Sequence, residues 1–250
     1  MKPYYQDSAV TIYHGDCREV LPSVGRYELM LTDPPYEIHA GAGGGCFGNR
    51  DHLVKTGGFT DGGVNFDFLD SVENWFCFCS RLQLPELIMR AKVRARWNLL
   101  TWCKPNPVPT CNNKYLPDVE YIVHAFTGGR LFGDMAVKSS FMLHPCGNKE
   151  TAHPNEKPLP LVNKLVSLGT MAGETVVDPF AGSGTTGRAA KDLGRKAVLI
   201  EREEKYCEIA ARRMGQEVLC FDNLNAHADL SAAYADKVRR VVRHSSGVEL

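Results

Sequence analysis

The sequence lacks a net charge, a long apolar run and a CxxC pair of cysteines. Its 29 basic and 29 acidic residues cancel, so any surface that binds a polyanion has to be a local patch. No apolar stretch approaches the roughly 18 residues that span a bilayer. The opening segment, MKPYYQDSAV, also lacks the apolar core of a signal peptide. We therefore expect a cytoplasmic protein.

The nine cysteines are scattered between positions 17 and 220. An odd set without CxxC spacing argues against a disulfide framework and against a structural zinc site. Reduced thiols in a cytosolic protein are the simplest interpretation, and we expect no bound metal ion. With 250 residues the chain is long enough for one large domain or two small ones.

Short apolar runs alternate with helical patterns along most of the chain. We predict strands at 9–14, 27–32, 98–103 and 119–126, and helices at 72–96 and 158–171. Pro85 should break or kink the helix at 72–96. The segment from Glu174 to Met214 then reads as strand, glycine loop, helix, strand and helix. This alternation indicates an α/β domain with a largely parallel sheet.

Three segments differ in composition from the alternating strands and helices, and the first of them cannot build much core. Residues 37–67 are rich in glycine and polar residues, residues 127–152 are rich in turn formers, and residues 226–250 are polar. We predict a surface loop for the first and a tail for the third, and the second is mixed in pattern. We assign residues 1–225 to one domain and 226–250 to the tail.

A glycine loop lies between a predicted strand and a predicted helix. Gly182, Gly184 and Gly187 spell GxGxxG, and Glu201 ends the next strand, where an acid can accept two hydrogen bonds from a ribose diol. The pattern points to a cofactor that contains adenosine. A tight turn in any doubly wound protein is one alternative, and a nicotinamide cofactor is another. Asp178, just before the loop, would repel a pyrophosphate and could pair with an ammonium group.

Two motifs together resemble one enzyme family. DPPY stands at 33–36, directly after a predicted strand, and DPFAGSGTTG begins at Asp178. The pair resembles the S-adenosylmethionine-dependent DNA amino-methyltransferases, which methylate N6 of adenine or N4 of cytosine. The catalytic motif precedes the cofactor motif, as in the permuted β-type arrangement. Further segments resemble the same family: HGDCREVL at 14–21, WCKPNPVP at 102–109, DVEYIVHAF at 118–126 and HPNEKP at 153–158.

The resemblance implies a Rossmann-like, doubly wound and mostly parallel sheet flanked by helices. It implies a single catalytic domain with a small target-recognition insertion, S-adenosyl-L-methionine as cofactor, and duplex DNA with a flipped target base as partner. In this arrangement the recognition segment usually follows the strand at 119–126. Here the gap, 127–152, is short, so the loop at 37–67 is a second candidate.

The resemblance assigns catalysis to Asp33, Pro34, Pro35 and Tyr36. An exocyclic amine is a poor nucleophile because its lone pair is delocalised into the ring. Two acceptors, the Asp33 carboxylate and the Pro34 carbonyl, would localise that pair and stabilise the charge that develops on nitrogen. Pro35 holds Pro34 extended. Tyr36 offers a face on which a flipped base can stack, worth about 1–3 kcal/mol. An ordinary strand-ending turn is the alternative.

The resemblance also assigns the cofactor site position by position. Phe180, Gly182 and Gly184 would shape the loop, and Glu201 would hold the ribose hydroxyls. Asp16, with Cys17 beside it, would reach the adenine. The residues implied at the methionine end are Lys157, Asp178, Ser183 and Thr185. A lysine and an aspartate there match the cofactor's carboxylate and its positive groups.

The functional hypothesis is N6-adenine methylation of DNA, because aspartate at the head of DPPY leans toward adenine in this family. N4-cytosine methylation stays open. Methylation of RNA amines or protein amides is a second class, and a non-catalytic nucleic-acid binder is the least favoured. Pro145-Cys146 could indicate covalent ring-carbon methylation, but the amine route already has its residues. The chain fits a solitary enzyme or the modifying half of a restriction–modification pair.

Overall fold

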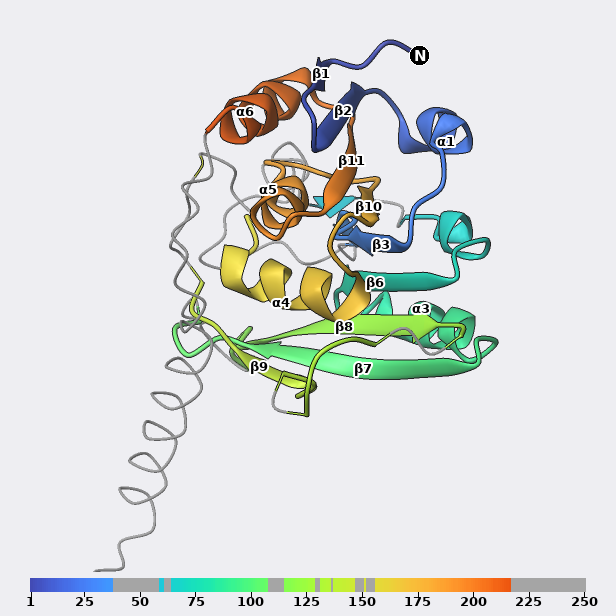
Figure 1. Ribbon diagram of the computed structural model, residues 1–250. Coiled ribbons are helices and arrows are strands. Elements are labelled where there is room, and N and C mark those ends of the chain that lie inside the picture. The colour runs from blue at the N-terminus through green and yellow to red at the C-terminus, as the bar shows by residue number, and fades with distance from the viewer. Residues whose placement is uncertain are drawn as a thin grey trace, which may run out of the picture. The chain divides into compact units, whose positions relative to one another are not determined.

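A nine-stranded sheet organises the computed structural model of the protein (Figure 1). The structure describes residues 1–37, the backbone of 59–60, and residues 64–107, 115–128, 131–135, 137–146, 151 and 156–216. Within these residues the strand order is β1-β2-β11-β10-β3-β6-β8-β7-β9. A separate two-stranded sheet pairs β4 with β5 in parallel.

The strands and helices have the following bounds. The large sheet comprises β1 (Tyr5–Gln6), β2 (Val10–His14), β3 (Leu29–Thr32), β6 (Asn74–Cys79), β7 (Arg96–Cys103), β8 (Val119–Phe126), β9 (Phe141–Leu143), β10 (Thr175–Asp178) and β11 (Lys196–Glu201). The small sheet comprises β4 (Tyr36–Glu37) and β5 (Phe59–Thr60). The helices are α1 (Cys17–Val20), α3 (Leu84–Ala91), α4 (Leu159–Gly169), α5 (Thr185–Asp192) and α6 (Glu204–Met214), with 3₁₀ turns η1 (Leu21–Ser23) and η2 (Asp67–Leu69).

The central strands β2, β11, β10, β3 and β6 are neighbours and run parallel. Antiparallel pairs join β1 to β2, β6 to β8 and β8 to β7. From β10 the chain proceeds to β11 on one side, whereas from β3 it proceeds to β6 on the other. In open α/β sheets, ligands bind outside the carboxyl ends of the strands at such a switch point. The predicted α/β fold with a mostly parallel sheet is confirmed.

The sheet has a core on each face. Leu29 and Leu31 of β3 pack in one core with residues of α4, α5 and α6, and Met30 packs in the other with residues of α3 and η2. Successive residues of a strand point to opposite faces, so a strand buried on both reads as a continuous apolar run. Helices cover both faces (Figure 1), which makes the sheet doubly wound.

The helix predicted at 72–96 is wrong. Residues 74–79, NWFCFC, form the buried strand β6 between β3 and β8, and α3 covers only Leu84–Ala91. A strand that is buried on both faces loses the alternation of polar and apolar residues. The hydrophobic periodicity of such an apolar run does not distinguish it from a buried helix. Pro85 lies in the first turn of α3, where its missing N–H is no loss, so it starts the helix rather than breaking it.

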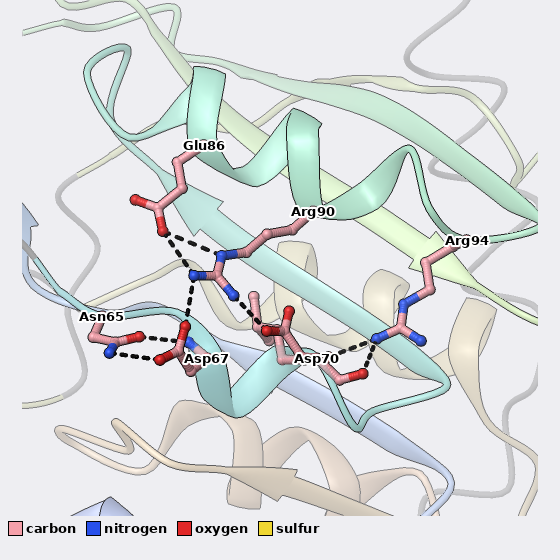
Figure 2. A network of polar contacts seen from close by, with 7 residues as sticks. Asn65, Asp67, Asp70, Glu86, Arg90 and Arg94 are labelled. Carbon is pink, nitrogen blue, oxygen red and sulfur yellow. Dashed lines mark hydrogen bonds and ion pairs between the residues drawn. The ribbon is translucent and has the colours of Figure 1, made fainter.

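A polar network attaches α3 to η2 and the turn after it (Figure 2). The Arg90 guanidinium lies 2.8 Å from carboxylate oxygens of both Asp67 and Asp70, and 3.1 Å from Glu86 one turn earlier in the helix. Arg94 donates to the backbone carbonyls of Leu69 and Asp70. The acidic partners are exposed, so solvent screens these pairs and the network mainly fixes the position of α3.

Several predictions fall outside the described residues. Most of 37–67, parts of 127–152 and all of 226–250 belong to this group. Residues 1–216 form one compact unit, and the predicted domain boundary at 225 stays a prediction. No helix in the described ranges is both long and apolar enough to cross a membrane.

Candidate active site

Acidic side chains line the carboxyl edge of the central strands. Asp16 follows β2, Glu201 ends β11, Asp178 ends β10 and Asp33 follows β3. These four strands are adjacent and parallel, so their ends meet at one edge. The edge therefore brings the predicted catalytic aspartate next to the predicted cofactor loop, with the switch point between β10 and β3.

Asp178 is buried at the centre of this row, with 4% of its surface exposed. Its Oδ2 accepts a 2.6 Å hydrogen bond from the Thr186 hydroxyl and its Oδ1 a 3.0 Å bond from the Phe180 N–H. Burial raises the pKa of Asp178 to about 7, and the neighbouring Asp33 carboxylate adds to the rise. A positively charged ligand group at this position would favour the ionised form.

The glycine loop joins β10 to α5, as the sequence predicts. Gly182 and Gly184 have φ of 51° and 78°, a region that L side chains rarely adopt. A Cβ on Gly184 would lie 2.9 Å from Cβ of Ala210, and one on Gly187 would lie 2.6 Å from Cδ1 of Leu199. The glycines therefore allow α5 to pack closely against α6 and β11 while the loop turns at the sheet edge.

Glu201 binds the loop from the next strand. Its Oε2 accepts a 2.8 Å hydrogen bond from Gly182 N–H, and its Oε1 accepts another of 2.8 Å from Glu203 N–H. Burial raises the pKa of this carboxyl group. Each carboxylate oxygen can accept a second hydrogen bond, so the two bonds leave capacity for ribose hydroxyls. That ribose role stays a prediction.

Asp16, Cys17 and Phe180 lie together at the far side of the loop. Asp16 caps α1 by accepting from Arg18 N–H at 2.9 Å, and the Arg18 guanidinium holds the pKa of Asp16 at about 2. Cys17 and Phe180 pack in the same small apolar cluster. The Phe180 ring centroid lies 5.7 Å from that of Phe68. The result is an apolar wall with a carboxylate at its rim, and the contact of this group with an adenine stays a prediction.

Asp33 and Lys157 form an ion pair that the sequence did not predict. Lys157 Nζ lies 2.6 Å from Asp33 Oδ2, and their side chains are 11% and 25% exposed. Asp33 Oδ1 is shielded from solvent and has no hydrogen-bond partner among the described residues. Burial raises the pKa of Asp33 and the Lys157 ammonium opposes that rise. The predicted contact of Lys157 with the methionine end of the cofactor stays a prediction.

The DPPY turn is held by contacts from the residue that precedes α3 and from β8. The Pro35 carbonyl accepts a 2.9 Å hydrogen bond from buried Gln83, which follows β6. The Tyr36 hydroxyl donates to Glu120 Oε2 at 2.8 Å. Lys157 Nζ lies 5.1 Å from the Tyr36 ring centroid. Gln83 and Glu120 were missed by sequence reasoning; for Glu120 the available signal was a charge at the start of an otherwise apolar strand.

A buried ion pair supports the other end of the site. Arg213 Nη1 lies 3.0 Å from Glu156 Oε1, with both side chains 3% exposed, and donates to the Thr185 hydroxyl at 3.0 Å. The hydroxyls of Ser183 and Thr185 are 3.5 Å apart. Glu156 precedes Lys157, so the pair links α6 to both the loop and the lysine. Its signal in the sequence was an arginine on the apolar face of α6, shared with Ala210 and Met214.

The residues present fit S-adenosylmethionine. A glycine cradle lets a ligand approach the backbone closely, and a buried carboxylate at the switch point, a second acid one strand away and an apolar wall match the ammonium, ribose and adenine that this cofactor presents. The arrangement also offers a buried acceptor, Asp33 Oδ1, beside that cradle. Chemically it can hold a cationic cofactor and bind an amine next to it.

Comparisons with known proteins agree with this geometry. A family model described as DNA methylase matches residues 137–212. The Type II methyltransferase M2.MboI of Moraxella bovis is 34% identical over 85% of this chain and 91% of its own length. The crystal structure of the M1.HpyAVI–SAM complex matches with a TM-score of 0.57 and 24% identity, over 82% of this chain and 99% of that one.

A third similar protein is the PvuII DNA methyltransferase, whose structure is described as cytosine-N4-specific. It matches with a TM-score of 0.62 and 18% identity, over 86% of this chain and 90% of that one. The two structural matches show the fold, and the M2.MboI match shows the family. The chain therefore belongs to the S-adenosylmethionine-dependent DNA amino-methyltransferases, the family of N6-adenine and N4-cytosine DNA methylases.

Proposed function

We propose that the enzyme methylates the exocyclic N6 of adenine in DNA. The observation that carries the proposal is the state of the Asp33 carboxylate. One oxygen is paired with Lys157, while the other is buried and has no hydrogen-bond partner in the described part of the chain. A buried acceptor without a donor is costly, so this oxygen is suited to an N–H from a substrate. It lies at the switch point, next to the strand that ends in Asp178.

The chemistry follows from placing two acceptors on one NH₂ group. Asp33 Oδ1 and the Pro34 carbonyl would each accept one N–H, which localises the nitrogen lone pair and stabilises its developing positive charge. S-adenosylmethionine, when bound, supplies the electrophilic methyl group on its sulfonium. Methylation leaves an extra proton on the nitrogen, and Asp33, whose pKa is raised by burial, is placed to accept it.

The same proposal assigns the cofactor's contacts to the row of acids. Asp178 would pair with the ammonium group, Glu201 would accept from the ribose hydroxyls, and Asp16 would reach the adenine beside Cys17 and Phe180. Ser183 and Thr185 would lie at the methionine carboxylate. Lys157 contacts Asp33 and Glu120, so we assign it to the catalytic carboxylate and keep its predicted contact with the methionine end as part of the proposal.

We further propose that the target base leaves the duplex and stacks on Tyr36. Extrusion costs a few kcal/mol, and stacking on an aromatic face returns about 1–3 kcal/mol. The segments 37–67 and 127–152 remain the proposed base readers. A cytoplasmic location follows from a DNA substrate and reduced cysteines. N4 of cytosine is the alternative target, and the PvuII enzyme of the same fold is described as specific for it.

Methylation of unmodified genomic DNA tests the proposal. The enzyme is incubated with S-adenosylmethionine that carries a labelled methyl group, and the digested nucleosides are analysed by mass spectrometry. Labelled N6-methyladenine is the expected product. Labelled N4-methylcytosine would replace the adenine assignment, and label in neither nucleoside would reject DNA amine methylation by this chain.

A further inference from the structure

Glu120 lies at the catalytic end of the sheet although it belongs to an antiparallel strand. It is the second residue of β8, which runs antiparallel to β6 and pairs Tyr121 with Cys79, the last residue of β6. The start of β8 therefore shares an edge with the end of β3, where Asp33 stands. No motif of the sequence assigns a function to this carboxylate.

Both oxygens of Glu120 are bound. Oε1 lies 2.5 Å from Lys104 Nζ at the end of β7. Oε2 accepts the Tyr36 hydroxyl at 2.8 Å and lies 3.2 Å from Lys157 Nζ. One side chain thus holds the proposed stacking ring and also the lysine that pairs with the catalytic aspartate.

The Glu120 carboxyl group is held in its ionised form. Burial alone would raise the pKa of this carboxyl group, but Lys157 and Lys104 outweigh burial and bring the pKa to about 2. Burial would lower the pKa of the Lys157 ammonium, and the carboxylates of Asp33 and Glu120 keep it above the usual value instead. The four charges therefore alternate along the row Lys104, Glu120, Lys157 and Asp33 and sum to zero.

Lys157 has little freedom in this environment. Its Nζ lies 5.1 Å from the ring centroid of Tyr36, 5.2 Å from that of Phe78 and 6.0 Å from that of Trp102. These rings favour a cation over their faces and exclude water from it. Glu120 and Asp33 then fix where the ammonium points, because they are the two carboxylates within ion-pair distance of it among the described residues.

We propose that Glu120 is a positioning residue for methyl transfer. By holding Lys157 and the Tyr36 hydroxyl together, it directs the ammonium to Oδ2 of Asp33 and leaves Oδ1 to the amine, with the Tyr36 ring at a fixed angle beside it. The inference rests on the proposed amine methylation, and it names a residue that acts on the reaction without touching the substrate.

Glu120→Gln is the direct test, because the amide keeps the size of the side chain and an acceptor for the Tyr36 hydroxyl but loses the charge. We expect kcat to fall about tenfold, equivalent to about 1.4 kcal/mol, with the calorimetric affinity for S-adenosylmethionine unchanged. Glu28→Gln is the matched control. Glu28 is 15% exposed against 18% for Glu120 and is also ion-paired, but it precedes β3 at the opposite edge of the sheet. Wild-type kcat in Glu120→Gln would overturn the proposal.

A second variant separates positioning from charge balance. Removing Glu120 alone leaves Lys104 without its partner, which can destabilise the fold. Lys104→Met/Glu120→Gln removes one charge of each sign. We expect it to unfold at a temperature close to that of the wild type and still to show the lowered kcat. Recovery of kcat in this double variant would mean that Glu120 only neutralises Lys104, and would overturn the proposal.

A measurement without turnover completes the test. In protein labelled with ¹⁵N-lysine, the ammonium signal of Lys157, assigned by its loss in Lys157→Arg, should be sharp in the wild type and in Glu28→Gln. It should be broadened or shifted in Glu120→Gln, and an unchanged signal would contradict the positioning role. If the wild type transfers no methyl group to DNA, the proposed function fails, while this spectrum still decides whether Glu120 holds Lys157.

Discussion

At the level of single residues, Asp33 is notable because the two oxygens of one carboxylate have different surroundings. Oδ2 is neutralised by Lys157 at 2.6 Å, and Oδ1 is buried without a donor in the described part of the chain. The lysine offsets the cost of burying the charge, and the second oxygen keeps its capacity to accept. DPPY predicts the acid, but no local pattern predicts which partner would hold it.

Asp33→Ala should abolish most turnover and leave the cofactor bound. Removing one preorganised partner of a transition-state charge typically lowers kcat by about 10²–10³-fold. The affinity for S-adenosylmethionine, measured by calorimetry, should change little, because the loop from Asp178 to Thr185 is intact. Asp67→Ala, an exposed carboxylate of η2, is the control and should behave as the wild type. Undiminished methyl transfer by Asp33→Ala would remove this residue from the mechanism.

Asp178 should make stability depend on pH. Its pKa is about 7 in the folded protein and about 3.8 when unfolded, so the folded state binds the extra proton between these values. Stability from this group is therefore greatest at low pH and declines as pH rises toward 7.

Urea unfolding of the wild type and of Asp178→Asn at pH 5 and pH 7.5 measures this effect. The free energy of unfolding of the wild type, relative to the variant, should fall by about 2 kcal/mol between the two values. The difference between the proteins cancels other titrations, including that of buried His124, whose pKa is lowered to about 3. A difference that does not change with pH would contradict the raised pKa.

At the level of elements, the sequence predicts the loop between β10 and α5 well, because glycine spacing and flanking periodicity are local. It fails at β6, where burial on both faces erases the alternation by which a strand is recognised. It also misses Gln83, whose hydrogen bond to the Pro35 carbonyl depends on how the end of β6 meets the end of β3. Such contacts follow from strand order, which no short segment encodes.

Gly184→Ala should disturb the packing of α5 on α6. Gly184 has φ of 78° and a new Cβ would meet Ala210 Cβ at 2.9 Å. Gly173→Ala is a matched control, because it has φ of 82° with nothing within 4 Å of the new atom. Backbone strain of about 1–2 kcal/mol is common to both, and the contact should add about 1–3 kcal/mol at Gly184 alone. Thermal unfolding measures the difference in stability between the two variants. Equal losses of stability would show that the contact with Ala210 does not destabilise Gly184→Ala.

At the level of the whole molecule, the site joins parts of the chain that are far apart in sequence. The Tyr36–Glu120 hydrogen bond spans 84 positions, and the Arg213–Glu156 pair links the last described helix to the segment before α4. The motifs in the sequence predict which segments take part, and the sheet determines how they meet. The overall charge is zero, so attraction to DNA has to come from cations gathered on one surface.

Binding to DNA should therefore depend steeply on salt although the protein is neutral. Each phosphate contact releases counterions, and about 6–10 contacts reduce affinity by about 10³–10⁵-fold between 50 and 200 mM salt. Fluorescence anisotropy with a labelled duplex, over a salt series, gives the slope of log affinity against log salt. The affinity for S-adenosylmethionine, measured by calorimetry over the same salt series, is the control. It should give a much smaller slope, because the charges of the cofactor would pair with charged groups inside the site, where salt screens them less. A duplex affinity as insensitive to salt as that of the cofactor would mean that no cationic surface of this protein engages the phosphate backbone.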